Sequence, residues 1–198
     1  MIPRDDKKTD QIFLAALGLV KEKGLAGITM CEIAREVGMA TGTLYIYFKN
    51  KDELINILFA ECRKASAEKY FQNYDPAQLF KLGFTKVWMN ILKFRIANFE
   101  EFFFMDRCYY SPFTNECTIK LTRQMIQPLF KLIERGRDEN VFKDVHTFSL
   151  LTFMIGSINE GVKNAHHSRK PLTRKIIAAM FTMCWEGMKG LNLSIDIN

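Results

Sequence analysis

The sequence predicts an all-α protein with an N-terminal three-helix domain and a larger C-terminal helical domain. Apolar residues recur at helical spacing along almost the whole chain of 198 residues. Helix-start signals such as Asn50 and Asp75-Pro76 separate these stretches from one another. No stretch has the alternating pattern of a strand. We expect the first domain to span residues 1–50 and the second to span residues 51–198.

Composition narrows the class of protein. Hydrophobic residues make up 48% of the chain, but no apolar run approaches membrane-spanning length, so we expect a soluble protein. The N-terminal sequence MIPRDDKKTDQ lacks the apolar core of a signal peptide, which predicts a cytoplasmic location. The five cysteines include no C-x-x-C pair, which predicts free thiols in a reducing compartment.

The net charge is weak evidence about partners. It is +6 overall, but residues 1–64 hold ten Lys and Arg against nine Asp and Glu, a net charge of +1. The stretch from Gly38 to Lys51 is more informative, because it holds two lysines and no acidic residue.

Three short helices are expected before residue 50. The first spans about residues 9–23 and ends before Gly24. Thr29 followed by Glu32 predicts a capping box at the start of the second, and Gly38 is a typical C-terminal stop. The third carries Leu44 and Phe48 on its buried side. The second and third of these helices, joined by a tight turn, form a helix-turn-helix.

The other side of the third helix indicates contact with a ligand outside the domain. It carries hydroxyls, aromatic rings and one β-branched residue, where a solvated helix would carry Glu, Lys and Ala. Hydroxyls donate to phosphate oxygens, and an apolar side chain can pack on a thymine methyl. Gly42 costs roughly 1 kcal/mol relative to Ala in a helix, but lets the helix start approach a phosphate closely.

This stretch resembles the DNA-binding domain of the TetR family of transcriptional regulators. The resemblance runs from about Ile12 to Leu58 and includes IT-x-x-x-IA-x-x-x-G and GTLY-x-YF-x-NK-x-x-L. It implies phosphate contacts from Thr29, Thr43, Tyr45, Tyr47 and Lys51, and base contacts from Thr41, Gly42 and Ile46.

The sequence leaves alternatives for four of these positions. The family usually has Ser or Thr where this chain has Ala40, so the recognition helix could begin at Thr41. It often has His in place of Tyr47. Lys51 is disfavoured at a helix start unless a phosphate is near, and the alternative is a solvated lysine. Ile46 could instead complete the core beside Leu44.

The second domain is predicted to hold longer helices. One spans residues 51–70, starting after the cap Asn50, and another starts at Asp75-Pro76 and ends near Ala97. A third spans about residues 115–135, where Pro128 should kink or divide it.

The region from Phe80 to Phe113 is rich in large aromatic side chains. Such composition fits a ligand cavity or a plain core equally well, and the family resemblance implies an effector pocket in this domain. We expect the pocket of an unknown small, largely apolar or aromatic effector to be lined in part by Phe84, Trp88, Met89, Phe103, Tyr110 and Met125.

The last two helices, at about 145–165 and 172–189, predict a homodimer interface. Apolar residues follow a 3,4 spacing typical of a coiled-coil seam, and the small residues Gly156 and Gly161 permit close approach. The alternative is an internal core. The interface is expected at Phe148, Leu151, Ile155, Ile158, Gly161, Val162, Ile177, Phe181 and Trp185.

No motif for catalysis, cofactor or metal binding is found: the sequence lacks a phosphate-binding glycine loop, an H-E-x-x-H motif and zinc-ligand spacing. We therefore expect no enzymatic activity. The predicted function is a dimeric repressor that binds double-stranded, palindromic operator DNA under the control of the effector. The alternative is a DNA-binding adaptor or structural protein of the same fold without a ligand.

Overall fold

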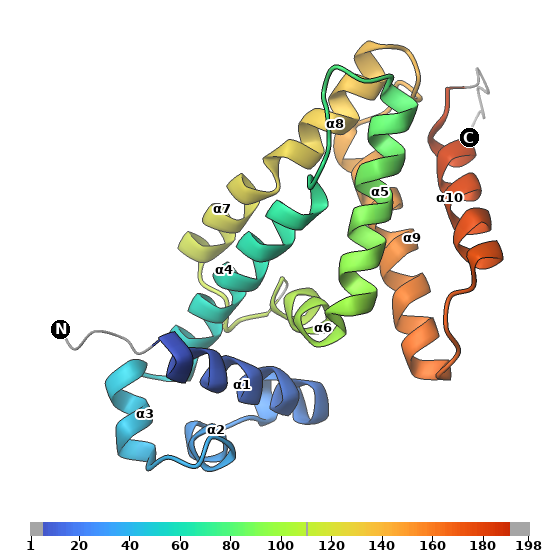
Figure 1. Ribbon diagram of the computed structural model, residues 1–198. Coiled ribbons are helices and arrows are strands. Elements are labelled where there is room, and N and C mark those ends of the chain that lie inside the picture. The colour runs from blue at the N-terminus through green and yellow to red at the C-terminus, as the bar shows by residue number, and fades with distance from the viewer. Residues whose placement is uncertain (1–5, 110, 191–198) are drawn as a thin grey trace, which may run out of the picture. The chain divides into compact units, whose positions relative to one another are not determined.

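The computed structural model describes residues 6–109 and 111–190 of the chain (Figure 1). This described part is helical, and this confirms the all-α prediction. Its one β feature is an isolated bridge between Phe142 and Lys189. The helices are α1 (Asp6–Gly27), α2 (Met30–Glu36), α3 (Thr41–Tyr47), α4 (Lys51–Tyr70), α5 (Phe80–Ala97), α6 (Phe99–Cys108), α7 (Glu116–Met125), α8 (Gln127–Asp138), α9 (Thr147–Ser168) and α10 (Arg174–Met188).

These helices form two compact units. The first unit consists of Met1–Ala67 with Ala97–Met125, and the second consists of Glu68–Ile96 with Ile126–Asn198. The first unit therefore contains α6 and α7 in addition to the three N-terminal helices and most of α4. The predicted functional boundary at residue 50 stays a prediction, because a compact unit need not coincide with a functional domain.

The first unit is centred on α1, which packs against both α2 and α6. Its core includes Ile12, Ile33 and Leu44, which are fully buried, and it extends along one side of α4 through Leu54 and Phe59. Burying these aliphatic and aromatic side chains is the main force that holds the short helices α2 and α3, since isolated helices of seven residues are unstable in water.

The second unit is built around α9, on which both α8 and α10 pack (Figure 1). A cluster of six aromatic rings fills its interior: Phe80, Phe84, Trp88, Phe142, Phe181 and Trp185. Successive ring centroids in this cluster lie 5.1 to 6.4 Å apart. Most of these pairs are tilted or edge-to-face, the arrangement that aromatic quadrupoles favour.

Two helix boundaries refine the sequence predictions. The helix expected to start at Asp75 begins instead at Phe80, because the Asp75 carboxylate accepts from the backbone N–H of Ala77 and forms a local turn. Arg135 then donates to the carbonyl oxygen of Gln78. The division expected at Pro128 is confirmed, with α7 ending at Met125 and proline occupying the first turn of α8.

Several negative features concern only the described residues. No helix among them is long and apolar enough to cross a membrane. Within the same ranges, no cluster of His, Cys, Asp and Glu could hold a metal ion. All five cysteines are free; Cys31 and Cys117 are exposed, and the other three are buried.

Candidate nucleic-acid interface

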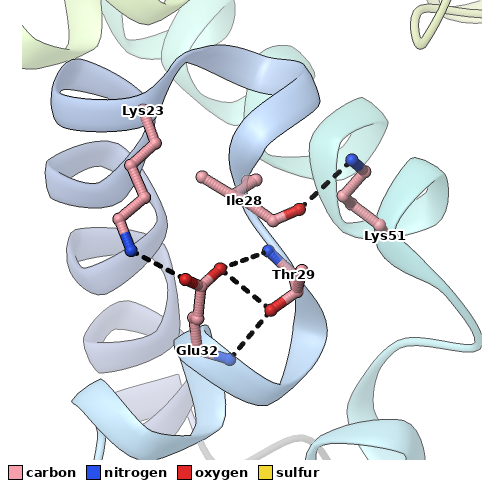
Figure 2. Close-up of polar contacts among 5 residues, drawn as sticks. All are labelled: Lys23, Ile28, Thr29, Glu32 and Lys51. Carbon is pink, nitrogen blue, oxygen red and sulfur yellow. Dashed lines mark hydrogen bonds and ion pairs between the residues drawn. The ribbon is translucent and has the colours of Figure 1, made fainter.

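Helix α2 is fixed at both ends by local hydrogen bonds. Thr29 is its N-cap: the Thr29 hydroxyl accepts from the Glu32 N–H at 3.2 Å, and the Glu32 carboxylate accepts from the Thr29 N–H at 3.0 Å (Figure 2). At the other end, Gly38 has φ 68° and donates to the Arg35 carbonyl, while Met39 donates to that of Ala34. This pair of bonds is a Schellman motif. The predicted capping box and glycine stop are both confirmed.

Glu32 also anchors α2 to α1. Its carboxylate lies 2.7 Å from the Lys23 ammonium group, as Figure 2 shows. The hydrogen bond from Lys23, followed by that from Thr29, lowers the pKa of Glu32 from 4.5 to about 2. The carboxylate is therefore charged at neutral pH and holds the start of the helix-turn-helix in place.

Helix α3 presents a distinct inner and outer face. Leu44 and Phe48 are fully buried, whereas Tyr45 is 50% exposed and Ile46 is 63% exposed. The alternative in which Ile46 completes the core is therefore wrong. The sequence left the start of this helix open; its first residue is Thr41, and its N-cap is Ala40, which makes no side-chain cap.

Gly42 has no role inside the protein that requires glycine. It is exposed in the first turn of α3, and a Cβ atom built there would meet no atom within 4 Å. Nothing in the fold therefore explains why the chain accepts the cost of glycine in a helix. An outside partner that approaches the helix start closely would explain it.

The remaining predicted DNA contacts differ in how far they are available. Thr43 is exposed, while Thr41 and Tyr47 are half-buried. The Thr29 hydroxyl donates to Glu32 at 2.9 Å, so a phosphate would have to compete for that proton. Lys51 is not the solvated lysine of the alternative reading, because its ammonium group donates to three backbone carbonyls of the α1 region.

Comparison with known proteins matches both parts of the chain to one family. Residues 12–57 match the family model described as "Bacterial regulatory proteins, tetR family", and residues 79–189 match that described as "Tetracyclin repressor-like, C-terminal domain". The second match alone covers more than half of the chain. The protein belongs to the TetR family. Members of this family are DNA-binding transcriptional regulators.

Individual relatives agree with this assignment. An uncharacterised HTH-type transcriptional regulator of Haemophilus influenzae is 34% identical over 94 residues, which are 46% of this chain and 50% of that protein. The fatty acid metabolism regulator protein of Bacillus subtilis is 41% identical over 51 residues, 26% of either chain. The aligned stretches thus span half or less of these two relatives, and their activities are not transferred whole.

The fold is shared over the full length. A crystal structure of a TetR family transcription regulator from Marinobacter aquaeolei superposes with a TM-score of 0.86. The match covers 96% of this chain and 100% of the other, at 20% sequence identity. At that identity the likeness establishes the architecture alone.

The residues predicted to line the effector pocket of this TetR-family protein fall in different units. Phe84 and Trp88 are fully buried, and with the half-buried Met89 they belong to the second unit. Phe103 and Met125 are half-buried in the first unit. Tyr110 lies outside the described residues. The pocket stays a prediction; the Phe84 ring lies 5.6 Å from that of Trp185, and the Trp88 ring lies 5.3 Å from that of Phe181.

Several predicted dimer-interface residues are core residues instead. Leu151, Ile158, Val162 and Trp185 are buried within the second unit, so a partner subunit cannot reach them in this packing. The physical reason is that α9 uses its 3,4 seam to pack on neighbouring helices of its own chain. Phe148 is 49% exposed and remains on the surface, and Ile155, Ile177 and Phe181 are half-buried.

Gly161 also serves the chain's own packing. A Cβ built there would collide with the Cε atom of Met180 on α10. The space beside this glycine is therefore occupied by a side chain of the same subunit. Gly156, in contrast, faces open space, with no atom within 4 Å of a built Cβ.

Sequence reasoning missed the exposed apolar residues Phe153 and Met183 of the same two helices. Phe153, Ile176 and Met183 are 50%, 45% and 65% exposed. With Met180 they line a groove of about 550 Å³ between α9 and α10. The available signal was Phe153 on α9, together with Ile176, Met180 and Met183, which are spaced by four and three residues on α10.

Proposed function

We propose that this TetR-family protein is a homodimeric repressor that binds a palindromic operator through α3 and is released or engaged by a small effector. The observation that carries the DNA-binding part is the outer face of α3. Its exposed apolar and hydroxyl side chains, together with a glycine that the fold does not need, contribute little to the stability of the protein itself.

The DNA contacts divide by chemistry. The hydroxyls of Thr41, Thr43, Tyr45 and Tyr47 suit phosphate oxygens or base edges, since they donate hydrogen bonds without carrying charge. Ile46 can only make apolar contact, which in the major groove means a thymine methyl. We assign sequence preference chiefly to Ile46 and to the close approach at Gly42.

A second copy of the chain is the proposed occupant of the exposed apolar surface on α9 and α10. Palindromic recognition needs two helices about 34 Å apart, which a single subunit cannot supply. Phe148, Phe153, Ile176 and Met183 are each 45–65% exposed, an arrangement that a dimer interface would bury. Gly156 leaves room for a partner helix.

Effector control concerns the aromatic cluster of the second unit. The aromatic content of α5 and α10 suits an apolar or aromatic ligand, but the rings around Phe84 pack on each other at 5.1 to 6.3 Å. This packing favours a second candidate function, a DNA-binding protein of the same fold without a ligand. We propose no catalytic activity for either candidate.

Selection of bound sequences from random double-stranded DNA by the purified protein tests the proposal. Enrichment of an inverted repeat, protected as two half-sites about one helical turn apart, is the expected result. Recovery of no common sequence would refute operator binding. A thermal-shift screen of apolar and aromatic compounds then separates the candidates: a compound that raises the melting temperature and changes operator affinity supports the repressor.

A further inference from the structure

Lys51 is held by the end of another helix. It is the first residue of α4, where the helix macrodipole disfavours a positive charge. Its ammonium group donates to the carbonyl oxygens of Leu25 at 3.2 Å, Ala26 at 3.3 Å and Ile28 at 3.2 Å (the last drawn in Figure 2). An ammonium group has three N–H donors, so all three are used inside the protein.

The three acceptors are carbonyls that need a partner. Leu25 and Ala26 lie in the last turn of α1, after the break at Gly24, and Ile28 follows the helix directly. The last carbonyl groups of a helix have no N–H partner within the helix. They also carry the partial negative charge of the helix dipole. The position of Lys51, unfavourable for α4, is therefore favourable for α1.

The Lys51 ammonium group also lies close to an aromatic ring. The ring centroid of Phe113 lies 4.5 Å from Nζ, within the range of a cation–π contact. Phe113 is itself held to α4 by Asn56, whose buried side-chain amide donates to the Phe113 carbonyl at 2.8 Å and accepts from the Asn115 N–H at 3.0 Å. Residues 113–115, between α6 and α7, are thus fastened to α4 beside Lys51.

We infer that Lys51 is a positioning residue for the helix-turn-helix and that residues 113–115 act on DNA binding through it. Ile28, one of its three acceptors, directly precedes Thr29, the N-cap of α2. A displacement of Phe113 changes the environment of the ammonium group, and through it the segment that places Thr29. This inference rests on the proposed function, because it concerns binding of an operator.

The inference differs in its consequences from a phosphate contact by Lys51. A lysine that neutralises a phosphate contributes about 0.9 to the slope of log K against log salt, so a dimer that loses it should lose roughly 2 from that slope. A lysine whose donors are occupied by carbonyls leaves the slope close to that of the wild type when it is replaced. Both roles weaken binding, so affinity alone does not separate them.

The decisive variant keeps the charge of Lys51 and removes the aromatic ring of Phe113 beside it. Phe113→Leu should weaken operator binding about tenfold, the order of one lost base contact, while keeping the salt slope of the wild type. Affinity is measured well below the melting temperature, determined for each variant, so that a loss of stability alone does not reduce binding. Phe99→Leu, a half-buried phenylalanine at the start of α6 and outside the contacts of Lys51, is the matched control and should bind as the wild type does.

The double variant tests whether the two residues act together. If Phe113 acts through Lys51, Lys51→Met and the combination with Phe113→Leu should bind equally weakly, with the wild-type slope. Lys49→Met, a neighbouring exposed lysine, controls for the loss of one positive charge. Independent losses from Phe113→Leu and Lys51→Met, or a slope lowered by roughly 2 in Lys51→Met but not in Lys49→Met, would overturn the inference.

Failure of the inference is distinguishable from failure of the proposed function. If the wild-type protein selects no operator, the proposed function fails before any variant is compared. If it selects an operator and Phe113→Leu binds it as tightly as wild type does, only the role of Lys51 is refuted.

Discussion

Replacing Gly42 by alanine should move fold stability and operator affinity in opposite directions. Gly42 is the second residue of α3, and a methyl group added there would meet no atom within 4 Å. The φ angle of Gly42 is not in the left-handed region, so alanine fits the backbone. Alanine restricts the unfolded chain and favours the helix, so Gly42→Ala should stabilise the protein by roughly 0.5–1 kcal/mol. For a chain of this size that corresponds to a melting temperature higher by about 1–4 °C.

The same methyl group should weaken DNA binding, because it occupies the space through which the DNA approaches the first turn of α3. We expect at least about tenfold lower affinity for the operator, the size of one disrupted base contact. Thermal unfolding followed by circular dichroism and operator binding followed by fluorescence anisotropy measure the two effects on the same sample.

Gly18→Ala is the matched control. Gly18 lies in α1 and also has open space around a built Cβ, so its replacement should raise the melting temperature without changing operator affinity. A Gly42→Ala variant that is more stable and still binds the operator as well as the wild type would refute the reasoning. The glycine would then have no partner outside the protein either.

Four further predictions follow from the described contacts. Ile46→Ala should change the free energy of unfolding by no more than about 0.5 kcal/mol, because the side chain is 63% exposed. It should weaken binding by about 1 kcal/mol or more per half-site on the operator only, with an unchanged salt slope. An equal loss of affinity for scrambled DNA would contradict this prediction. Gly156→Leu should give a folded monomer in sedimentation, whereas a dimer would exclude this surface as the interface. The ion pair of Glu32 should stabilise the protein above pH 4.5 and be lost as the pH falls towards 2, since folding lowers its pKa to about 2; melting temperatures of Glu32→Gln should lack this decline. Trp88 and Trp185 both contact Phe181, so an effector that enters this cluster should change the fluorescence of both; a change confined to one would place the ligand elsewhere.

The N-terminal part of the fold could be predicted because its signals are local. A capping box needs only Thr29 and Glu32 three residues apart, and a Schellman stop needs only a glycine at Gly38. The inner face of α3 follows from the spacing of Leu44 and Phe48. Each of these features is decided within one turn of helix, so neighbouring sequence contains the required information.

The surfaces of α9 and α10 could not be predicted in the same way. Both helices carry apolar residues on more than one side, and spacing alone does not tell which row packs inward. On α9, Leu151 and Ile158 face the core while Phe153 is half exposed; on α10, Trp185 is buried while Met183 is exposed. The deciding information is the placement of α8 and α10 against α9, which depends on residues far apart in the chain.

For Lys51, the helix-dipole rule correctly predicts that a compensating negative charge is needed, but it does not identify the group that provides the charge. The helix dipole of α4 predicts that a cation at its first position needs a compensating negative charge. A DNA phosphate would provide one, but so does the C-terminal end of α1, which the chain brings to the same ammonium group. Both partners would use the same three N–H donors, so a phosphate could bind only by displacing a carbonyl that places α2. The number of ions released on DNA binding therefore distinguishes a phosphate partner from the carbonyls of α1. The presence of a lysine in the sequence pattern does not distinguish them.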